Sequence, residues 1–431
     1  MAARPRRTSD SLSSPDDPFL CPGSRPWLGE FGGGCGQPLR GALRGAGNVY
    51  FPKVESSIYL PRKEGAVSAA VHDLTRRPDV SSVMKLIQDM TDDDTPDAKL
   101  ITLIRKRLPR ELLDPFTDQE LLAGYYDLTG AGSEQLADPS AGSQSLSGSD
   151  EWRHPEFLVI RQTPKDDYLS GTNPGIHPDL AGWFDRVRSI DVLRETRALR
   201  GFTRVRDDEL RLNVGKAMLR RKSLPPDKDW LPAYVVKGEG IYLELGADQL
   251  AAWESRAEVR ARADKLAAQY RGVTSKRGLP QGRAISPRFV LIHTLGHLLI
   301  NELVFTCGYS SASLRERLYV SDTPGREMAG ILIYTAAGDS EGTMGGLVRM
   351  SRPDSLRQVI ASALDDARWC STDPVCMDAG EKGQGPDSCN LAACHGCALL
   401  PETSCEEFNR FLDRGLVIGT FNDPGLGFFR R

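Results

Sequence analysis

Six of the nine cysteines of this chain lie between Cys370 and Cys405, in the string WCSTDPVCMDAGEKGQGPDSCNLAACHGCALLPETSC. The string is rich in Gly and Pro and has few large apolar side chains, so it cannot build an ordinary core. A metal ion held by four thiolates gives such a segment a fixed shape, because metal binding supplies folding free energy. The pair Cys394-x2-Cys397 has the spacing of two cysteine ligands that is common in structural zinc sites. The sequence therefore predicts a structural zinc-binding knuckle.

Six cysteines compete for the four positions of a tetrahedral site. The preferred ligands are Cys394, Cys397 and Cys405 with Cys376 as the fourth, while Cys370 is the reserve and Cys389 the last choice. A closed site of four thiolates has no open position for a substrate, which argues against a catalytic metal. The alternatives are a set of disulfides, or reduced cysteines without a ligand role. A secreted disulfide scaffold is disfavoured because the polar N-terminus has no signal peptide.

The composition bounds the class of protein. With 431 residues, 40% of them hydrophobic, the chain is long enough for several domains with ordinary buried cores. The formal net charge of −3 gives no overall positive field, so any DNA-binding surface must be a local patch. The longest apolar stretch, residues 289–305, is interrupted by polar side chains and is short for a membrane span, which favours a buried helix. We therefore expect a cytoplasmic protein without membrane association.

Local patterns predict a mixed α/β protein of several domains, with a helical insertion and a C-terminal α/β domain that carries the knuckle. The expected segments are a disordered N-terminus (1–20), a Gly/Pro-rich segment with Cys21 and Cys35 (21–65), a helical region (66–128), a flexible linker (129–150), a mixed α/β region (151–271), a second linker (272–287) and the C-terminal domain (288–431). Within the mixed region, the runs EFLVI, LPAYVV and GIYLEL resemble strands, and Gly238 and Gly240 predict a turn between the last two. Residues 247–270 predict one long amphipathic helix.

Two histidines, His293 and His297, stand four residues apart in the apolar stretch and share one face of a helix, with Asn301 one turn further on. The spacing resembles that of zinc-protease helices, but Thr294 follows the first histidine where the general base would be a glutamate. We favour a polar stripe whose side chains find hydrogen-bond partners inside a packed helix. A contact with the knuckle or with a partner subunit is the other interpretation.

The string TAAGDSEGTMGGL follows a predicted buried strand, ILIY, and its glycines permit unusual backbone angles. Such a turn can hold phosphate through its amides, but the Lys-Ser/Thr ending of a P-loop is missing. A structural turn is the preferred interpretation. The chain has no Walker A string and no dinucleotide fingerprint, so the sequence does not support an ATPase.

A basic run from Thr196 to Lys222 contains nine Lys or Arg against three acids. Such a run can neutralise phosphates and give salt-sensitive DNA binding, although most charge runs are solvated faces. The candidate nucleic-acid contacts are Arg197, Arg200, Arg204, Arg206, Arg220 and Arg221, with Arg211, Lys216 and Lys222 in the same run.

Several long strings carry a family resemblance: RFVLIHTLGHLLINEL, ILIYTAAGDSEGTMGGLV, AACHGCALLPETSCEEFNRFLDR and, far upstream, RGAGNVYFPKVESSIYLP. From about Cys21 to Leu416 the chain resembles the DrmB family, core proteins of the bacterial anti-phage system DISARM. The C-terminal part is similar to the zinc-binding domain of Mrf-type DNA-repair helicases, in which the cysteines hold the metal. The resemblance implies a non-motor subunit that acts beside a separate helicase subunit, DrmA, in a complex that engages DNA.

The resemblance also implies that the chain is a short form, because family members carry a further N-terminal region with additional cysteines. A late start codon, a truncation or a shorter natural variant would each explain the difference. Cys21 and Cys35 alone are too few to close a zinc site.

Three functions remain as expectations. The first is a non-catalytic, DNA-engaging accessory subunit with structural zinc and no small-molecule substrate, working with a helicase in phage defence. The second is a metal-dependent hydrolase or nuclease that uses His293 and His297 with acids such as Asp339 and Glu341. The third is a protein-binding scaffold without affinity for DNA.

Overall fold

A computed structural model of the protein describes residues 51–60, 69–91, 95–129, 148–203, 212–220, 228–277, 283–335, 345–379 and 382–430, with positions 20, 36, 38, 224 and 225. The chain forms two compact units, Leu60–Ser149 and a larger one made of Met1–Tyr59 and Asp150–Arg431. Nearly all of the predicted disordered N-terminus, most of the 129–150 linker, Cys21 and Cys35 lie outside the described residues.

The smaller unit is helical. Its helices are α1 (Ala69–Arg76), α2 (Pro78–Asp89), α3 (Asp97–Arg107), α4 (Arg110–Leu113) and α5 (Asp118–Thr129). Apolar residues three or four apart put one face of each helix inside, as Val80, Met84 and Ile87 do on α2. They pack against Leu100 and Ile104 of α3 in a core that belongs to this unit alone.

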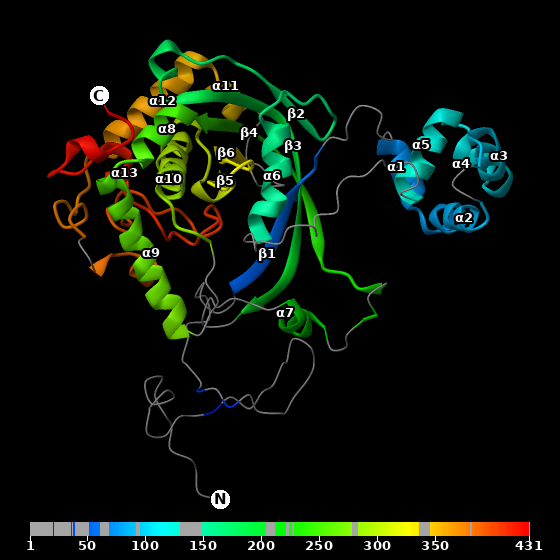
Figure 1. Ribbon diagram of the computed structural model, residues 1–431, viewed down its shortest axis with the longest axis horizontal. Helices are drawn as coiled ribbons and strands as arrows, with labels where there is room; N and C mark the ends of the chain where they lie inside the picture. Colours follow the sequence, from blue (N-terminus) through cyan, green and yellow to red (C-terminus); the bar gives the residue numbers. More distant parts are fainter. Residues whose placement is uncertain are drawn as a thin grey trace, which may run out of the picture. The chain divides into compact units, whose positions relative to one another are not determined.

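The larger unit is built on one antiparallel sheet. Its strands are β1 (Phe51–Ile58), β2 (Leu169–Thr172), β3 (Phe184–Thr203), β4 (Ala233–Leu245), β5 (Leu314–Ser321) and β6 (Met328–Thr335). They are ordered β1-β3-β4-β6-β5, and β2 pairs with another part of β3. Figure 1 shows the sheet as long curved strands, with β1 in blue beside β3 in green. Its helices are α6 (Gly148–Ile160), α7 (Leu212–Leu219), α8 (Ala247–Glu254), α9 (Ala257–Arg277), α10 (Pro287–Cys307), α11 (Gly346–Met350), α12 (Pro353–Asp366) and α13 (Arg414–Ile418).

Alternate side chains of each strand point to opposite faces of the sheet, and at β5 and β6 both faces are buried. On one face Leu318 and Ile333 join the main hydrophobic core, into which α10 packs. On the other face Arg317 and Tyr319 meet α6, whose Glu156 accepts hydrogen bonds from the Arg317 guanidinium at 2.5 and 2.7 Å. The prediction of a mixed α/β protein is confirmed.

Helix α10 is the central helix of the main core. Ser286 caps its first turn by accepting a hydrogen bond from the amide of Phe289, and Gly308 ends it in the left-handed conformation. The helix is long and apolar enough to span a membrane, but 72% of its most hydropathic window is buried inside the protein, as in a core helix. Gly296 permits its close approach to the sheet: a Cβ there would lie 2.3 Å from the Ile331 side chain and 3.0 Å from the Glu316 carboxylate.

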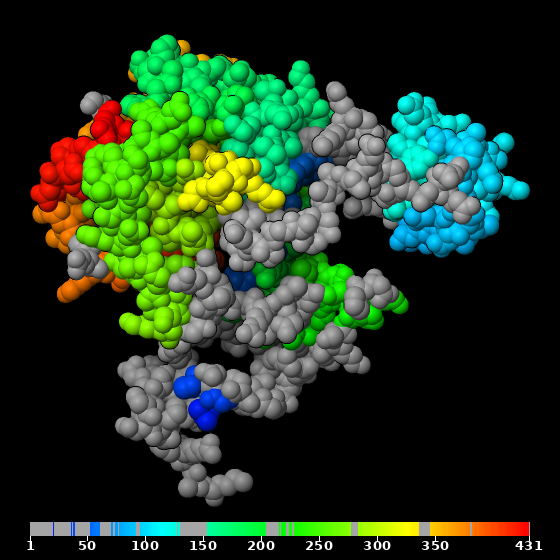
Figure 2. Space-filling model, viewed as in Figure 1, coloured from blue at the N-terminus to red at the C-terminus, as the bar shows by residue number. Residues whose placement is uncertain are grey.

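The C-terminal segment packs against the helices that follow β4. The indole of Trp253 on α8 donates a hydrogen bond to the carbonyl of Leu426, and its ring meets Phe428 edge to face. Figure 2 shows this segment, in red, lying beside the light-green surface of α8 and α9.

Several local predictions were wrong. The run EFLVI lies in helix α6, because the periodicity of so short an apolar run does not separate helix from strand. LPAYVV and GIYLEL belong for the most part to one strand, β4, without a turn between them. Gly238 and Gly240 are needed for close packing, since a Cβ at these positions would lie 2.3 and 2.7 Å from carbonyl oxygens of β6.

The helix predicted at 247–270 is two helices, α8 and α9, and α9 continues to Arg277, inside the expected linker at 272–287. No domain boundary separates the mixed region from the C-terminal region, because β4 pairs with β6 in one sheet.

Candidate metal centre

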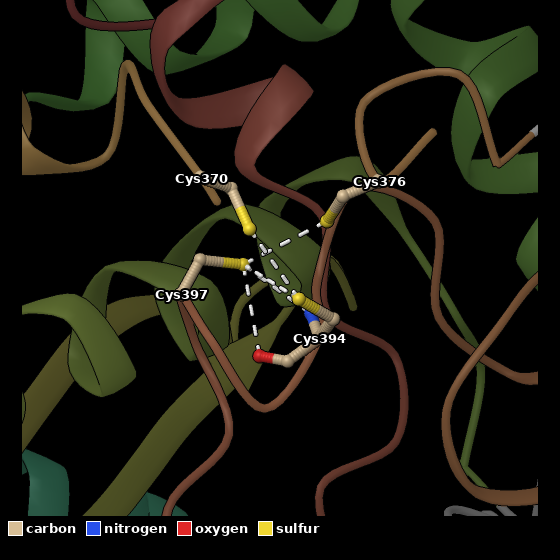
Figure 3. Close-up of side chains that lie close together, drawn as sticks. All are labelled: Cys370, Cys376, Cys394 and Cys397. Atoms are coloured by element: carbon tan, nitrogen blue, oxygen red, sulfur yellow. Dashed lines mark hydrogen bonds between the residues drawn. The ribbon is translucent and has the colours of Figure 1, made fainter. Parts of the chain in front are cut away.

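Four cysteine sulfurs converge between two loops of the larger unit (Figure 3). Cys370 and Cys376 lie in the loop that follows α12, and Cys394 and Cys397 lie in the loop that precedes α13. The sulfurs of Cys370 and Cys394 are 3.4 Å apart, and Cys397 lies 3.8 Å from both Cys376 and Cys394. None of these distances is that of a disulfide, which is about 2.05 Å.

The spacing fits a tetrahedral metal ion. With bonds of about 2.3 Å between zinc and sulfur, neighbouring sulfurs of a tetrahedron lie about 3.8 Å apart. Two of the sulfur–sulfur distances given above equal that edge length and the third is 0.4 Å shorter, and all four sulfurs lie within 4.8 Å of one another. The Cys394–Cys397 turn is closed by a bond from the Cys397 amide to the Cys394 carbonyl at 3.1 Å, and the Cys394 amide donates to the Cys397 sulfur at 3.3 Å.

Asp373 and Arg414 hold the first loop in place. The Asp373 carboxylate accepts hydrogen bonds from the amides of Cys370 at 2.8 Å and Met377 at 3.1 Å. It also pairs with the fully buried guanidinium of Arg414, whose Nη2 lies 3.6 Å from the Cys376 sulfur. Four thiolates outnumber the charge of a divalent ion by two, so a cation at this place offsets part of the excess.

Hydrogen bonds to the sulfur of Cys376 favour its thiolate form. A hydrogen bond with the Cys397 sulfur, followed by bonds from Gln384 and Arg414, lowers the pKa of Cys376 to about 5 against the opposing effect of burial. The contact with Cys376 in turn raises the pKa of Cys397. A metal ligand must be deprotonated, and the contacts with Gln384 and Arg414 favour that form of Cys376.

The structure places two of the predicted cysteines elsewhere. Cys405, one of the preferred ligands, lies outside the four-cysteine cluster and contacts His293, while the reserve Cys370 completes the cluster. The chain beyond Cys397 turns back toward β5, where the Ser404 carbonyl accepts a hydrogen bond from the amide of Glu316. Cys389 is fully buried in the main core.

His293 and His297 are fully buried and face Glu316 of β5. Burial opposes ionisation of Glu316, yet the neighbouring His293 imidazole holds the pKa of this carboxyl well below its usual range. Burial also lowers the pKa of His297. Sequence reasoning missed Glu316, although a glutamate inside the apolar run LRERLYVS of a buried strand is a signal that a partner lies opposite.

Three arginines of the basic run lie among the described residues, and each of them pairs with a carboxylate of the protein. Arg197 is buried on β3, and its guanidinium pairs at 2.7 Å with Glu195 on the same face of the strand. Arg200 pairs with Glu55, and Arg220 pairs with Asp229 at 2.6 Å. The other candidates, Arg204, Arg206, Arg211, Arg221 and Lys222, lie outside the described residues, as does the side chain of Lys216.

Two amides at the end of the glycine-rich string, both among the described residues, point to a carboxylate of the protein. Glu239 accepts hydrogen bonds from the amides of Gly345 and Leu347, and also from the Tyr309 hydroxyl at 3.0 Å. These amides are therefore already occupied. Asp339 and Glu341, proposed for the hydrolase alternative, lie outside the described residues.

Comparison with known proteins identifies the domain that holds the four-cysteine cluster. The family model described as the MrfA Zn-binding domain matches residues 295–398, a range that includes all four clustered cysteines and ends before Cys405. The chain thus carries an MrfA-type zinc-binding domain.

A relative covers nearly the whole chain. The DISARM protein DrmB of Bacillus paralicheniformis is 30% identical over 417 residues, which are 96% of this chain and 70% of the relative. This chain therefore belongs to the DrmB family of DISARM proteins, and the resemblance seen in its sequence strings is confirmed.

Proposed function

We propose that this chain is a non-catalytic subunit of a cytoplasmic DISARM defence complex, in which it engages DNA beside a separate DrmA-like helicase subunit. The observation that carries the proposal is the 30% identity to DrmB over 96% of the chain, together with the four-cysteine cluster inside the matched zinc-binding domain. Unoxidised, clustered thiols suit a reducing compartment such as the cytoplasm.

In this proposal a structural zinc ion joins the two loops of the four-cysteine cluster. Cys370, Cys376, Cys394 and Cys397 would hold it, and four protein ligands leave no position for a substrate. The ion supplies a fixed connection between the end of α12 and the segment that leads into α13. Met377, Leu391 and Leu400 of these loops join the main hydrophobic core, so the ion adds a cross-link to a segment that is already packed.

Two further features support a role without catalysis. His293 and His297, the candidates for a hydrolytic metal site, are fully buried, so a DNA strand cannot reach them in this conformation. The sequence contains no P-loop with which to drive a motor of its own.

A basic concavity supports the engagement of DNA. A hollow of about 550 Å³ on the larger unit is lined by seven described residues, of which three are arginines (Arg161, Arg186 and Arg188) and none is acidic. Glu244 pairs with Arg161 at 2.9 Å and with Arg186 at 2.6 Å, so two of the three guanidinium groups share one carboxylate. Burial and the neighbouring Arg186 lower the pKa of Arg188, as expected where positive charge is only partly compensated. Phosphate oxygens would complete this balance.

The zinc role is tested with Cys397→Ser and a matched control, Cys307→Ser, whose half-buried cysteine lies outside the four-cysteine cluster. In cells that carry the full DISARM gene set, Cys397→Ser should abolish phage protection and co-purification with the helicase subunit, and Cys307→Ser should keep both. Purified Cys397→Ser should contain about one metal ion less per chain. Unchanged metal content and unchanged protection in Cys397→Ser would refute the role.

DNA engagement is tested by fluorescence anisotropy with labelled single-stranded and duplex oligonucleotides over a series of salt concentrations. The double change Arg186→Gln and Arg188→Gln should weaken binding and reduce the slope of log K against log salt by about 1.8, since each lost phosphate contact removes about 0.9 on a duplex. Arg260→Gln, an exposed arginine on α9, is the control. Wild-type protein without affinity at low salt would favour a protein-binding scaffold, and metal-dependent cleavage of the DNA would contradict a non-catalytic role.

A further inference from the structure

A second group of metal-ligating side chains lies apart from the four-cysteine cluster. It consists of His293 and His297 of α10, Glu316 of β5 and Cys405, and one ligand atom from each lies within 4.8 Å of all the others. The four residues are at most 7% exposed. His293 Nε2 lies 3.1 Å from Glu316 Oε1 and 3.2 Å from the Cys405 sulfur. These distances are close to the edges of a tetrahedron around zinc, about 3.3 to 3.8 Å.

His297 directs an electron pair into this group. Its Nδ1 lies 2.7 Å from the Ala398 carbonyl, which can only accept, so in the neutral ring the proton is on Nδ1 and Nε2 is bare. Nε2 faces Glu316 Oε1 at 3.6 Å, and both atoms carry lone pairs. Among the residues that the structure describes, neither His297 Nε2 nor Glu316 Oε2 has a hydrogen-bond partner. The lone pairs of His297 Nε2 and of the Glu316 carboxylate repel each other. A cation between this nitrogen and the carboxylate would remove the repulsion and give both groups a partner.

The sulfur of Cys405 is surrounded as a metal-bound thiolate would be. The backbone amides of Glu407 and Asn409 point at it from 3.3 and 3.2 Å. Bonds of this kind stabilise negative charge on sulfur. Glu316 is held by the Glu406 amide, which donates to Oε1 at 3.1 Å. The hydrogen bond from His297 to the Ala398 carbonyl likewise holds a ligand in place, because it fixes the tautomer and the orientation of the imidazole.

We propose that His293, His297, Glu316 and Cys405 bind a second divalent transition-metal ion, with zinc as the best match. One carboxylate and one thiolate balance the charge of a divalent ion, so the filled site is neutral inside the core. Two nitrogens, one oxygen and one sulfur suit zinc better than the oxygen-seeking magnesium or calcium. All four ligands are protein atoms and all are buried, so the ion is structural. It fastens the segment after Cys397 to α10 and β5.

Gly296 supports the assignment, since it stands between the two histidines on the same helix. A Cβ there would lie 3.0 Å from Glu316 Oε2 and 2.3 Å from a side chain of β6. The glycine thus brings both imidazoles within reach of the carboxylate on the neighbouring strand.

The test uses the full chain, purified without a histidine tag and loaded with zinc. X-ray absorption at the zinc edge measures which elements bind zinc in the wild-type protein. The result therefore does not depend on whether a variant folds. Two filled sites contribute five sulfurs and three nitrogen or oxygen atoms in total, and the four-cysteine cluster alone contributes sulfur only. A first shell made of sulfur alone would overturn the proposal.

Metal counting by mass spectrometry assigns the site to its residues. Cys405→Ser and Glu316→Gln should each lose about one ion per chain, Cys397→Ser should lose the other, and Cys397→Ser with Cys405→Ser should lose both. Cys307→Ser should keep the wild-type content. If Cys405→Ser and Glu316→Gln fold with the wild-type metal content, the second site does not exist, whatever the result for Cys397→Ser.

Discussion

Removing the guanidinium of Arg317 should be among the most destabilising single changes in the larger unit. Arg317 is about 1% exposed and binds the Glu156 carboxylate through two hydrogen bonds of 2.5 and 2.7 Å, with a third to the Ser56 hydroxyl at 2.8 Å. These contacts join β5 to α6 and β1. Arg317→Met keeps most of the apolar volume but leaves the Glu156 carboxylate buried without its main partner. Breaking a buried pair in this way costs about 3 to 5 kcal/mol.

A loss of about 4 kcal/mol reduces the folding equilibrium constant roughly a thousandfold. Urea unfolding followed by tryptophan fluorescence measures this loss of stability in the larger unit. The fluorescence reports on that unit alone because residues 60–149, the smaller unit, contain no tryptophan. Arg368→Met, which breaks only an exposed ion pair, is the control and should cost less than about 1 kcal/mol.

The double variant Arg317→Met with Glu156→Leu separates charge from packing. Replacing both partners of a buried pair by apolar groups is often neutral, so most of the lost stability should return. Glu195 does not become unpaired in this variant, since it keeps Arg197 at 2.7 Å. A cost below about 1 kcal/mol for Arg317→Met, or a double variant no more stable than the single one, would refute the reasoning.

Three further predictions concern the packing of α10, the metal centre and the helical unit. Gly296→Val should cost at least about 1 to 3 kcal/mol in the same fluorescence assay, because its Cβ would lie 2.3 Å from a β6 side chain; an unchanged midpoint would contradict this. Arg414→Met should weaken zinc binding about tenfold in competition with a chromophoric chelator, since the guanidinium that faces Cys376 is lost; equal affinity would show that this charge is unimportant. Ile104→Ala should destabilise the helical unit by about 2 to 5 kcal/mol, seen by circular dichroism, and leave the tryptophan transition in place; a shift of that transition would mean that the two units unfold together.

Local patterns in the sequence were sufficient for several features. The Cys394–Cys397 spacing indicated the metal knuckle, and the apolar stretch at 289–305 indicated the buried helix that the structure has as α10. Both depend on residues close together in the chain, whose geometry is set by the turn or the helix itself. The long strings shared with DrmB also identified the family, because sequence identity is a property of the linear chain and needs no knowledge of the fold.

Long-range convergence was decided by the tertiary structure alone. Spacing did not reveal that Cys370 joins the four-cysteine cluster, or that Cys405 lies beside His293, 112 residues away in the chain. Nor did composition reveal that Arg197 is buried, since that depends on what packs against its face of β3. Sequence periodicity fixes which side of an element a residue occupies, but the element that packs against that side depends on the whole chain. The four-cysteine cluster was therefore predictable as chemistry, and its ligands and the second group around Glu316 became visible only in the folded protein.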